Sequence, residues 1–205
     1  MRGLIWFLAG AITLIAITCS GALIFLKTRA NGFSAQAQPS ALERWAARQA
    51  RAIAMSAGAR ARPNPVADSP EVLAAARAHW ADHCAACHAN NGRGDTEVGK
   101  HMYPPSPDMR REATQDLTDG ELFYIIQNGI RLTGMPSWGS GTSHDEEDSW
   151  KLVRLIRHLP KLTAEEDREM QELNPKSPQE MKEEQEERDF LNGDQSHEQT
   201  QHKRH

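Results

Sequence analysis

The chain has little cysteine, few apolar residues and no excess of positive charge. Its 205 residues include three cysteines, too few for the multi-bridge framework of a small secreted scaffold. Apolar residues make up 39% of the chain and the mean hydropathy is −0.66, which excludes a protein that crosses a membrane many times. The formal net charge of −4 argues against a general nucleic-acid binder, so we expect no nucleic-acid partner.

The one long apolar run extends from Leu4 to Leu26, 23 residues without a charge. A helix of that length would reach about 35 Å, enough to cross a hydrocarbon core of about 30 Å. A cleaved signal peptide would have a shorter apolar core, about 7–15 residues, followed by a small-x-small site. Ala35-Gln36-Ala37 offers such a site but lies well beyond the run. We therefore expect residues 1–27 to be an uncleaved single-pass anchor.

Charge is distributed unevenly along the rest of the chain. Residues 27–69 carry a net +5 and are rich in Ala, Arg and Pro, so we interpret 28–67 as a basic linker. An amphipathic helix within this linker either lies on anionic lipid or acts as a spacer. Its apolar face is formed by Leu42, Trp45, Ala46 and Ile53.

The carboxyl-terminal end is acidic, because residues 163–205 carry a net −7. Thr163 and Glu166 can cap one or two further turns of helix. Beyond these turns the composition is typical of a flexible, solvated tail.

No segment alternates apolar and polar residues convincingly, which argues against strands. Apolar residues instead recur every three or four positions between residues 68 and 162. Ser69 can cap a helix whose first position is Pro70, and Thr118 with Glu121 forms a capping box. Ser143 and Glu146 are predicted to cap a last helix in the same way. We therefore predict an all-α domain over 68–162.

The strongest motif is Cys84-Ala85-Ala86-Cys87-His88, the C-x-x-C-H pattern of c-type haem attachment. Its thiols are spaced to lie on one side of a helical turn, with the imidazole directly after them. A zinc site would need a fourth ligand and usually a second ligand pair, but no second C-x-x-C exists. A thioredoxin-like pair would follow a strand, whereas this pair follows a helical pattern.

Two more blocks follow the motif: a tight loop at Gly134-Met135-Pro136 and the apolar face of the last helix, Trp150–Leu159. With these blocks in this order, residues 68–162 resemble class I c-type cytochromes, specifically membrane-anchored bacterial proteins with a single haem. The resemblance implies a small helical domain around one covalent, iron-containing haem c, bound through Cys84 and Cys87. It also implies that His88 is the proximal and Met135 the distal iron ligand.

The resemblance implies three further details of the site. The carbonyl of Pro104 or Pro105 would accept the Nδ1 proton of His88. Relatives also place a glycine eight residues before the first cysteine, opposite an aromatic residue of the last helix, where the first and last helices cross; here these two positions hold Ala76 and Leu155. We expect the crossing to survive this exchange. Other distal candidates are Met102, Met109, His101, His144 and His158, of which we expect the last two to be solvated.

Histidine–methionine ligation would leave no open position on the iron, so we predict an electron carrier and not an enzyme. One alternative is a haem subunit of a larger respiratory oxidoreductase complex, and another is a sensory or catalytic haem protein with a displaceable methionine. Haem attachment outside the cytoplasmic membrane, as the resemblance implies, places the haem domain on the periplasmic side. The expected partners are the membrane and redox proteins, either a respiratory complex or a soluble carrier.

Overall fold

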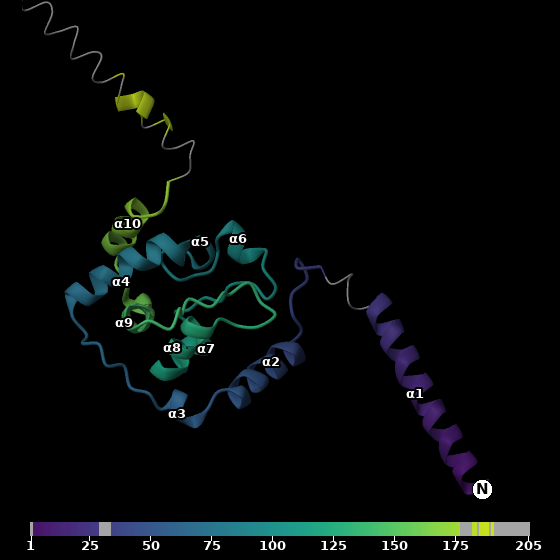
Figure 1. Ribbon diagram of the computed structural model, residues 1–205. Helices are drawn as coiled ribbons and strands as arrows, with labels where there is room; N and C mark the ends of the chain where they lie inside the picture. The colour runs from purple at the N-terminus through teal and green to yellow at the C-terminus, as the bar shows by residue number, and fades with distance from the viewer. Residues whose placement is uncertain (1, 29–33, 177–181, 184, 189, 191–205) are drawn as a thin grey trace, which may run out of the picture.

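The computed structural model describes residues 2–28, 34–176, 182–183, 185–188 and 190. These ranges contain no strand, so the all-α prediction is confirmed. The helices lie around a small central core, with α1 extending away from it (Figure 1). In chain order they are α1 (Arg2–Thr28), α2 (Ala41–Ala54), α3 (Ala57–Arg60), α4 (Pro70–His83), α5 (Ala85–His88), α6 (Glu97–Lys100), α7 (Glu112–Gln115), α8 (Asp119–Asn128), α9 (Ser143–His158), the 3-10 helix η2 (Leu159–Lys161) and α10 (Ala164–Glu172).

The predicted helix starts are confirmed at α4 and α8. The Ser69 side chain accepts a hydrogen bond from the Val72 N–H at 3.3 Å. Thr118 and Glu121 form a complete capping box.

The predicted start of α9 was wrong by one residue. Thr142 caps this helix, because its extended backbone turns its hydroxyl toward the Asp145 N–H at 3.3 Å. Ser143 is the first residue inside the helix.

The core lies where the first and last helices of the domain meet. Helix α4 packs on α9, and α8 packs on α9 from another side. Ala76 and Leu155 are both buried, so the helix pair survives the exchange of glycine and aromatic residues for these two side chains. The buried apolar cluster is formed by Ala76, Trp80, Ala81, Ala85, Leu122, Phe123, Ile126, Trp150, Leu152, Val153, Leu155, Ile156, Leu159 and Met170.

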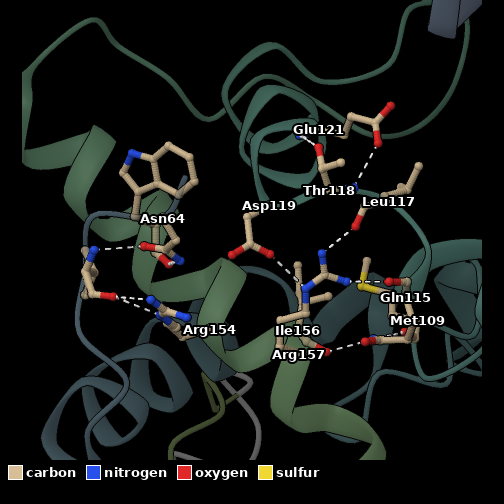
Figure 2. Close-up of polar contacts among 12 residues, drawn as sticks. Asn64, Met109, Gln115, Leu117, Thr118, Asp119, Glu121, Arg154, Ile156 and Arg157 are labelled. Carbon is tan, nitrogen blue, oxygen red and sulfur yellow. Dashed lines mark hydrogen bonds and ion pairs between the residues drawn. The ribbon is translucent and has the colours of Figure 1, made fainter. Parts of the chain in front are cut away.

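The segment before α4 is held against the domain by hydrogen bonds to α9. The Asn64 side chain donates to the Trp150 carbonyl at 3.0 Å. The Arg154 guanidinium donates twice to the Val66 carbonyl, at 2.9 and 2.6 Å (Figure 2). Helix α3 packs on α8. The basic segment that precedes the domain therefore has a fixed place on it.

Side chains of α9 also hold the connection between α7 and α8. The Arg157 guanidinium pairs with Asp119 at 2.9 Å and donates to the carbonyls of Gln115 and Leu117 (Figure 2). The Gln115 amide donates to the carbonyls of Met109 and Ile156 at 2.7 and 2.9 Å. The end of the proline-rich loop, which contains Pro104, Pro105 and Pro107, is therefore fixed to the last helix.

The capping box at Thr163 and Glu166 is confirmed, and it opens a helix of nine residues, α10. This helix packs on α4, where Arg77 pairs with Glu166 at 3.0 Å. Met170 is fully buried in the core. The first part of the acidic region is thus built into the domain, and most of the remaining tail lies outside the described residues.

Helix α1 is exposed to solvent along its whole length and is long and apolar enough to cross a membrane. A signal sequence near the N-terminus has the same properties. The helix is therefore a candidate for either a membrane anchor or a signal.

Candidate haem site

The two thiols and the imidazole of the C-x-x-C-H motif lie in one turn of helix. Cys84 ends α4, where its N–H donates to the Trp80 carbonyl at 2.8 Å. The N–H groups of Cys87 and His88 then donate to the Cys84 carbonyl at 3.2 and 2.9 Å. Both cysteines are half-buried and free, so neither is used in a disulfide. The predicted arrangement of two thiols followed by an imidazole on a turn is present.

His88 is buried beside Trp80. Its side chain and backbone together are only 8% exposed, and the two ring centroids lie 5.8 Å apart. Burial lowers the pKa of the imidazole to about 4, because a charged ring would lose its hydration there. The ring is therefore neutral at physiological pH, the form in which a histidine nitrogen can bind iron.

Burial also acts on the first thiol of the motif. It raises the pKa of Cys84 to about 12, with a smaller contribution from Cys87. The thiol is consequently protonated at neutral pH, and a protonated thiol is a poor nucleophile.

Neighbouring loops hold the backbone of this turn. The Trp80 indole N–H donates to the Ala89 carbonyl at 3.0 Å. The Thr96 hydroxyl donates to the carbonyls of Ala86 and Cys87, at 2.8 and 3.2 Å. A Cβ atom at Gly99 would collide with the Cys87 carbonyl, so α6 approaches the turn too closely for any other residue. The hydrogen bonds by which Trp80 and Thr96 hold this backbone were not predicted, because they join residues that a loop separates in the sequence.

The proline-rich loop lies against the loop that follows His88. The Ser106 N–H donates to the Gly99 carbonyl at 2.9 Å, and the Met109 N–H donates to the Gly92 carbonyl at 2.8 Å. The predicted hydrogen bond from His88 Nδ1 to the carbonyl of Pro104 or Pro105 is not formed. Within the described part of the chain, this buried nitrogen has no hydrogen-bond partner. The prediction failed because the loop docks through other backbone groups.

Met135 lies half-buried in a loop that α8 supports. The Ile130 N–H donates to the Met135 carbonyl at 3.1 Å, and the Met135 N–H donates to the Thr133 hydroxyl at 3.1 Å. The Trp138 N–H then donates to the Ile126 carbonyl at 3.1 Å. These bonds fold the loop back along the end of α8.

An aromatic contact joins the Met135 loop to the C-x-x-C-H turn. Trp138 meets His83 edge to face, with ring centroids 5.5 Å apart. His83 directly precedes Cys84, and Trp138 follows Met135 by three residues. The two blocks, separated by about 50 residues in the sequence, are therefore neighbours in space.

The other distal candidates lie in different surroundings. The sulfur of Met102 lies against Gly134, so this methionine contacts the Met135 loop. His101 and His144 are exposed and pair with Glu97 and Asp148. His158 is not solvated as predicted; its Nε2 lies 3.0 Å from a Glu166 oxygen, in a half-buried position. The correction follows from α10, which covers that side of α9.

The donor set fits a covalently held haem better than a zinc ion. No group of three or more His, Cys, Asp or Glu side chains in the described ranges is arranged to hold a metal ion. A single buried imidazole with two free thiols on one turn is instead the set that haem attachment uses.

Comparison with known proteins agrees with this geometry. Residues 71–156 match the family model described as Cytochrome C oxidase, cbb3-type, subunit III. No curated protein matches the chain. The matched segment runs from the first turn of α4 through most of α9, and so it contains the C-x-x-C-H turn and the Met135 loop. Residues 71–156 are therefore a class I c-type cytochrome domain, a haem-based electron-transfer module that holds haem c and its iron covalently.

Proposed function

We propose that this protein is a membrane-anchored one-electron carrier with one haem c, held by Cys84 and Cys87 and ligated by His88 and Met135. The observation that carries the proposal is a buried, neutral imidazole on the same turn as two free thiols. The Met135 loop lies beside this turn through the contact between His83 and Trp138. Residues 68–162 with α10 packed on them would be the carrier domain, 28–67 the connection to the anchor, and the residues after α10 an acidic extension.

Each site residue has a distinct task in this proposal. The Cys84 and Cys87 thiols would add across the two vinyl groups of the haem, each S–H and C=C becoming a thioether and a C–H. The neutral ring of His88 would donate a nitrogen lone pair to the iron, and Met135 would supply a thioether sulfur that favours the ferrous state. These residues would hold a haem that supplies one-electron chemistry. Ligation by both side chains would leave no position on the iron for a substrate, which favours a carrier over an enzyme.

Attachment is tested by replacing both thiols. The Cys84→Ser/Cys87→Ser chain, produced in a host with a haem maturation system, should lose the haem stain on a denaturing gel. The matched control is Cys19→Ser, which removes the cysteine in α1 and should keep the stain. A wild-type chain that is colourless, with reactive Cys84 and Cys87, would reject the proposal.

The distal ligand is tested with two matched methionine variants, because Met102 contacts the loop that contains Met135. Met135→Leu should lose the far-red sulfur–iron charge-transfer band of the oxidised protein, lower the reduction potential and allow carbon monoxide to bind. Met102→Leu should keep the band. The reverse pattern would assign Met102 as the ligand. A wild-type protein that binds carbon monoxide readily would favour a sensory or catalytic haem protein.

A second candidate function is that of a subunit in a respiratory oxidase complex. The description of the matched family model, subunit III of a cbb3-type oxidase, favours it. Co-purification from gently solubilised membranes distinguishes the two functions. An oxidase subunit should elute with other haem proteins in fixed ratio, whereas a free anchored carrier should elute alone and still accept electrons reversibly in a redox titration.

The anchor is part of the same proposal. We propose that α1 stays uncleaved in the cytoplasmic membrane and that the haem domain faces the periplasm. The mass of the mature holoprotein then equals the full chain plus one haem. Protease added to intact spheroplasts should digest the haem domain. Loss of the first 30 or so residues from the mature mass would show that α1 is a cleaved signal.

A further inference from the structure

Helix α2 turns one side toward the cytochrome domain. Five residues of α2 and its C-cap line a cleft of about 180 Å³ opposite Ala113, Leu117 and Glu121 of the domain: Arg48, Gln49, Arg51, Ala52 and Met55. Met55, at the end of α2, is buried. The Tyr103 hydroxyl also donates a hydrogen bond to Glu43 near the start of the helix. Helix α2 is therefore docked on the domain with a defined orientation.

An adjacent face of α2 presents large apolar side chains to solvent. Leu42, Trp45 and Ile53 are 72%, 57% and 82% exposed. Their spacing places them on one helical face, away from Arg48 and Arg51. Removing such side chains from water is favourable, so a face of this kind gains stability when something covers it. In the part of the chain that the structure describes, nothing covers it.

The position of α2 in the chain indicates what covers this face. Residues 29–40 are all that separate α2 from α1, the candidate membrane helix. Twelve residues span at most about 40 Å, so α2 cannot move far from the point where α1 leaves the bilayer. Arg44 and Arg48 are exposed on the same helix. Exposed arginines on one side and Trp, Leu and Ile on the other are the features of a helix that lies in an anionic lipid interface.

We infer that the apolar face of α2 lies in the headgroup region of the bilayer that α1 spans, so that α2 holds the cytochrome domain on the membrane surface. The inference rests on the anchor in the proposed function. Of the two interpretations of the sequence, a lipid-bound helix or a spacer, it selects the lipid-bound helix and states which face of α2 meets the lipid. A spacer helix surrounded by water would leave Leu42, Trp45 and Ile53 without a cover.

Membrane contact through α2 would determine which side of the domain redox partners can reach. In Figure 1, α2 and α3 lie on one side of α8, and α4 and α5 lie on the other. The C-x-x-C-H turn would therefore be held away from the lipid, across the domain. Docking through α2 thus limits the orientations of the domain and leaves the haem side toward the periplasm.

Spin labels test this inference in the full-length holoprotein, reconstituted in vesicles of phosphatidylcholine and phosphatidylglycerol. Labels at Leu42→Cys and Ile53→Cys, each in a Cys19→Ser background, report the apolar face of α2. Leu173→Cys, exposed at the end of α10, is the matched control. Depth is read from the ratio of collisions with oxygen, which enters lipid, to collisions with a water-soluble nickel chelate.

The ratio should rise at Leu42→Cys and Ile53→Cys above its value at Leu173→Cys. A label on the native Cys19 reports α1 separately. If the Cys19 label reports lipid and both α2 labels keep the collision ratio of a label in water, the membrane contact of α2 is wrong, whereas the assignment of α1 as a membrane anchor is retained. If the Cys19 label also reports water, both the membrane anchor α1 and the membrane contact of α2 are rejected.

Discussion

Phe123 of α8 and Trp150 of α9 stack face to face, with ring centroids 4.0 Å apart and planes 11° from parallel. The Arg62 guanidinium lies 4.6 Å from the Phe123 ring centroid and 5.3 Å from that of Trp150. It also pairs with Glu146 at 3.3 Å. One aromatic pair therefore joins two core helices and the segment between α3 and α4.

Removing this stack should destabilise the domain strongly. Trp150→Ala is expected to lower the free energy of unfolding by about 3–5 kcal/mol, because it leaves a cavity and an unpartnered Phe123 ring. Urea unfolding of the holoprotein in detergent, followed by circular dichroism, measures the loss. Phe190→Ala, which removes an exposed ring outside the core, is the control and should cost less than about 0.5 kcal/mol. Equal stability of the two variants would contradict the packing described.

The contact between α3 and α8 depends on one glycine. A Cβ atom at Gly120 would collide with the carbonyl oxygens of Ala59 and Arg60, so Gly120→Ala should push α3 away from α8. We expect faster protease cleavage between residues 55 and 67 and a loss of roughly 1–3 kcal/mol, as for overpacked sites. Gly58→Ala is the matched control, since a Cβ there meets open space. It should be neutral or slightly stabilising. Similar cleavage of both variants would mean that α3 does not pack on α8.

A carboxylate in the loop before α7 should make stability depend on pH. Hydrogen bonds from the Arg110 side chain at 2.8 and 2.9 Å hold the pKa of Asp108 well below its usual range, and Arg111 contributes a further bond. Because the folded pKa lies below the unfolded value of about 3.9, the carboxylate stabilises the fold fully above that pH. This stabilisation is lost as the pH falls below about 4 toward the folded pKa.

Asp108→Asn should therefore cost about 1–3 kcal/mol near pH 7. The difference from wild type should shrink as the pH falls below about 4. Urea midpoints measured across this pH range provide the test, with Asp116→Asn, an exposed carboxylate, as the comparison. A cost for Asp108→Asn that does not change with pH would remove the ion pair as its cause.

The first helix of the acidic region should behave as part of the domain. Met170 is fully buried and α10 packs on α4, so Met170→Ala is expected to cost about 2–5 kcal/mol in urea unfolding. Leu173→Ala, at a position that is half exposed, should cost far less. If Met170→Ala unfolds at the wild-type urea concentration, α10 is not part of the cooperative unit.

Features that depend on a few neighbouring residues could be read from the sequence. The two thiols and the imidazole of Cys84, Cys87 and His88 share a turn because helical geometry places i and i+3 on one side. The caps at Ser69, Thr118 and Thr163 follow from hydroxyl groups that reach an N–H three residues ahead. Even here a choice between adjacent hydroxyls, Thr142 and Ser143, needed the backbone angle.

Features that depend on which surfaces meet were decided only by the tertiary structure. The burial of Met170, the approach of α3 to Gly120 and the contact of Met102 with Gly134 join residues far apart in the chain. Periodicity identifies an apolar face but not its partner, since hydrophobic attraction has no direction. For α2 the sequence determined that one side is apolar and the other basic. The packing of the described residues decided that Arg51 and Met55 line a cleft against the domain, whereas Leu42, Trp45 and Ile53 stay exposed.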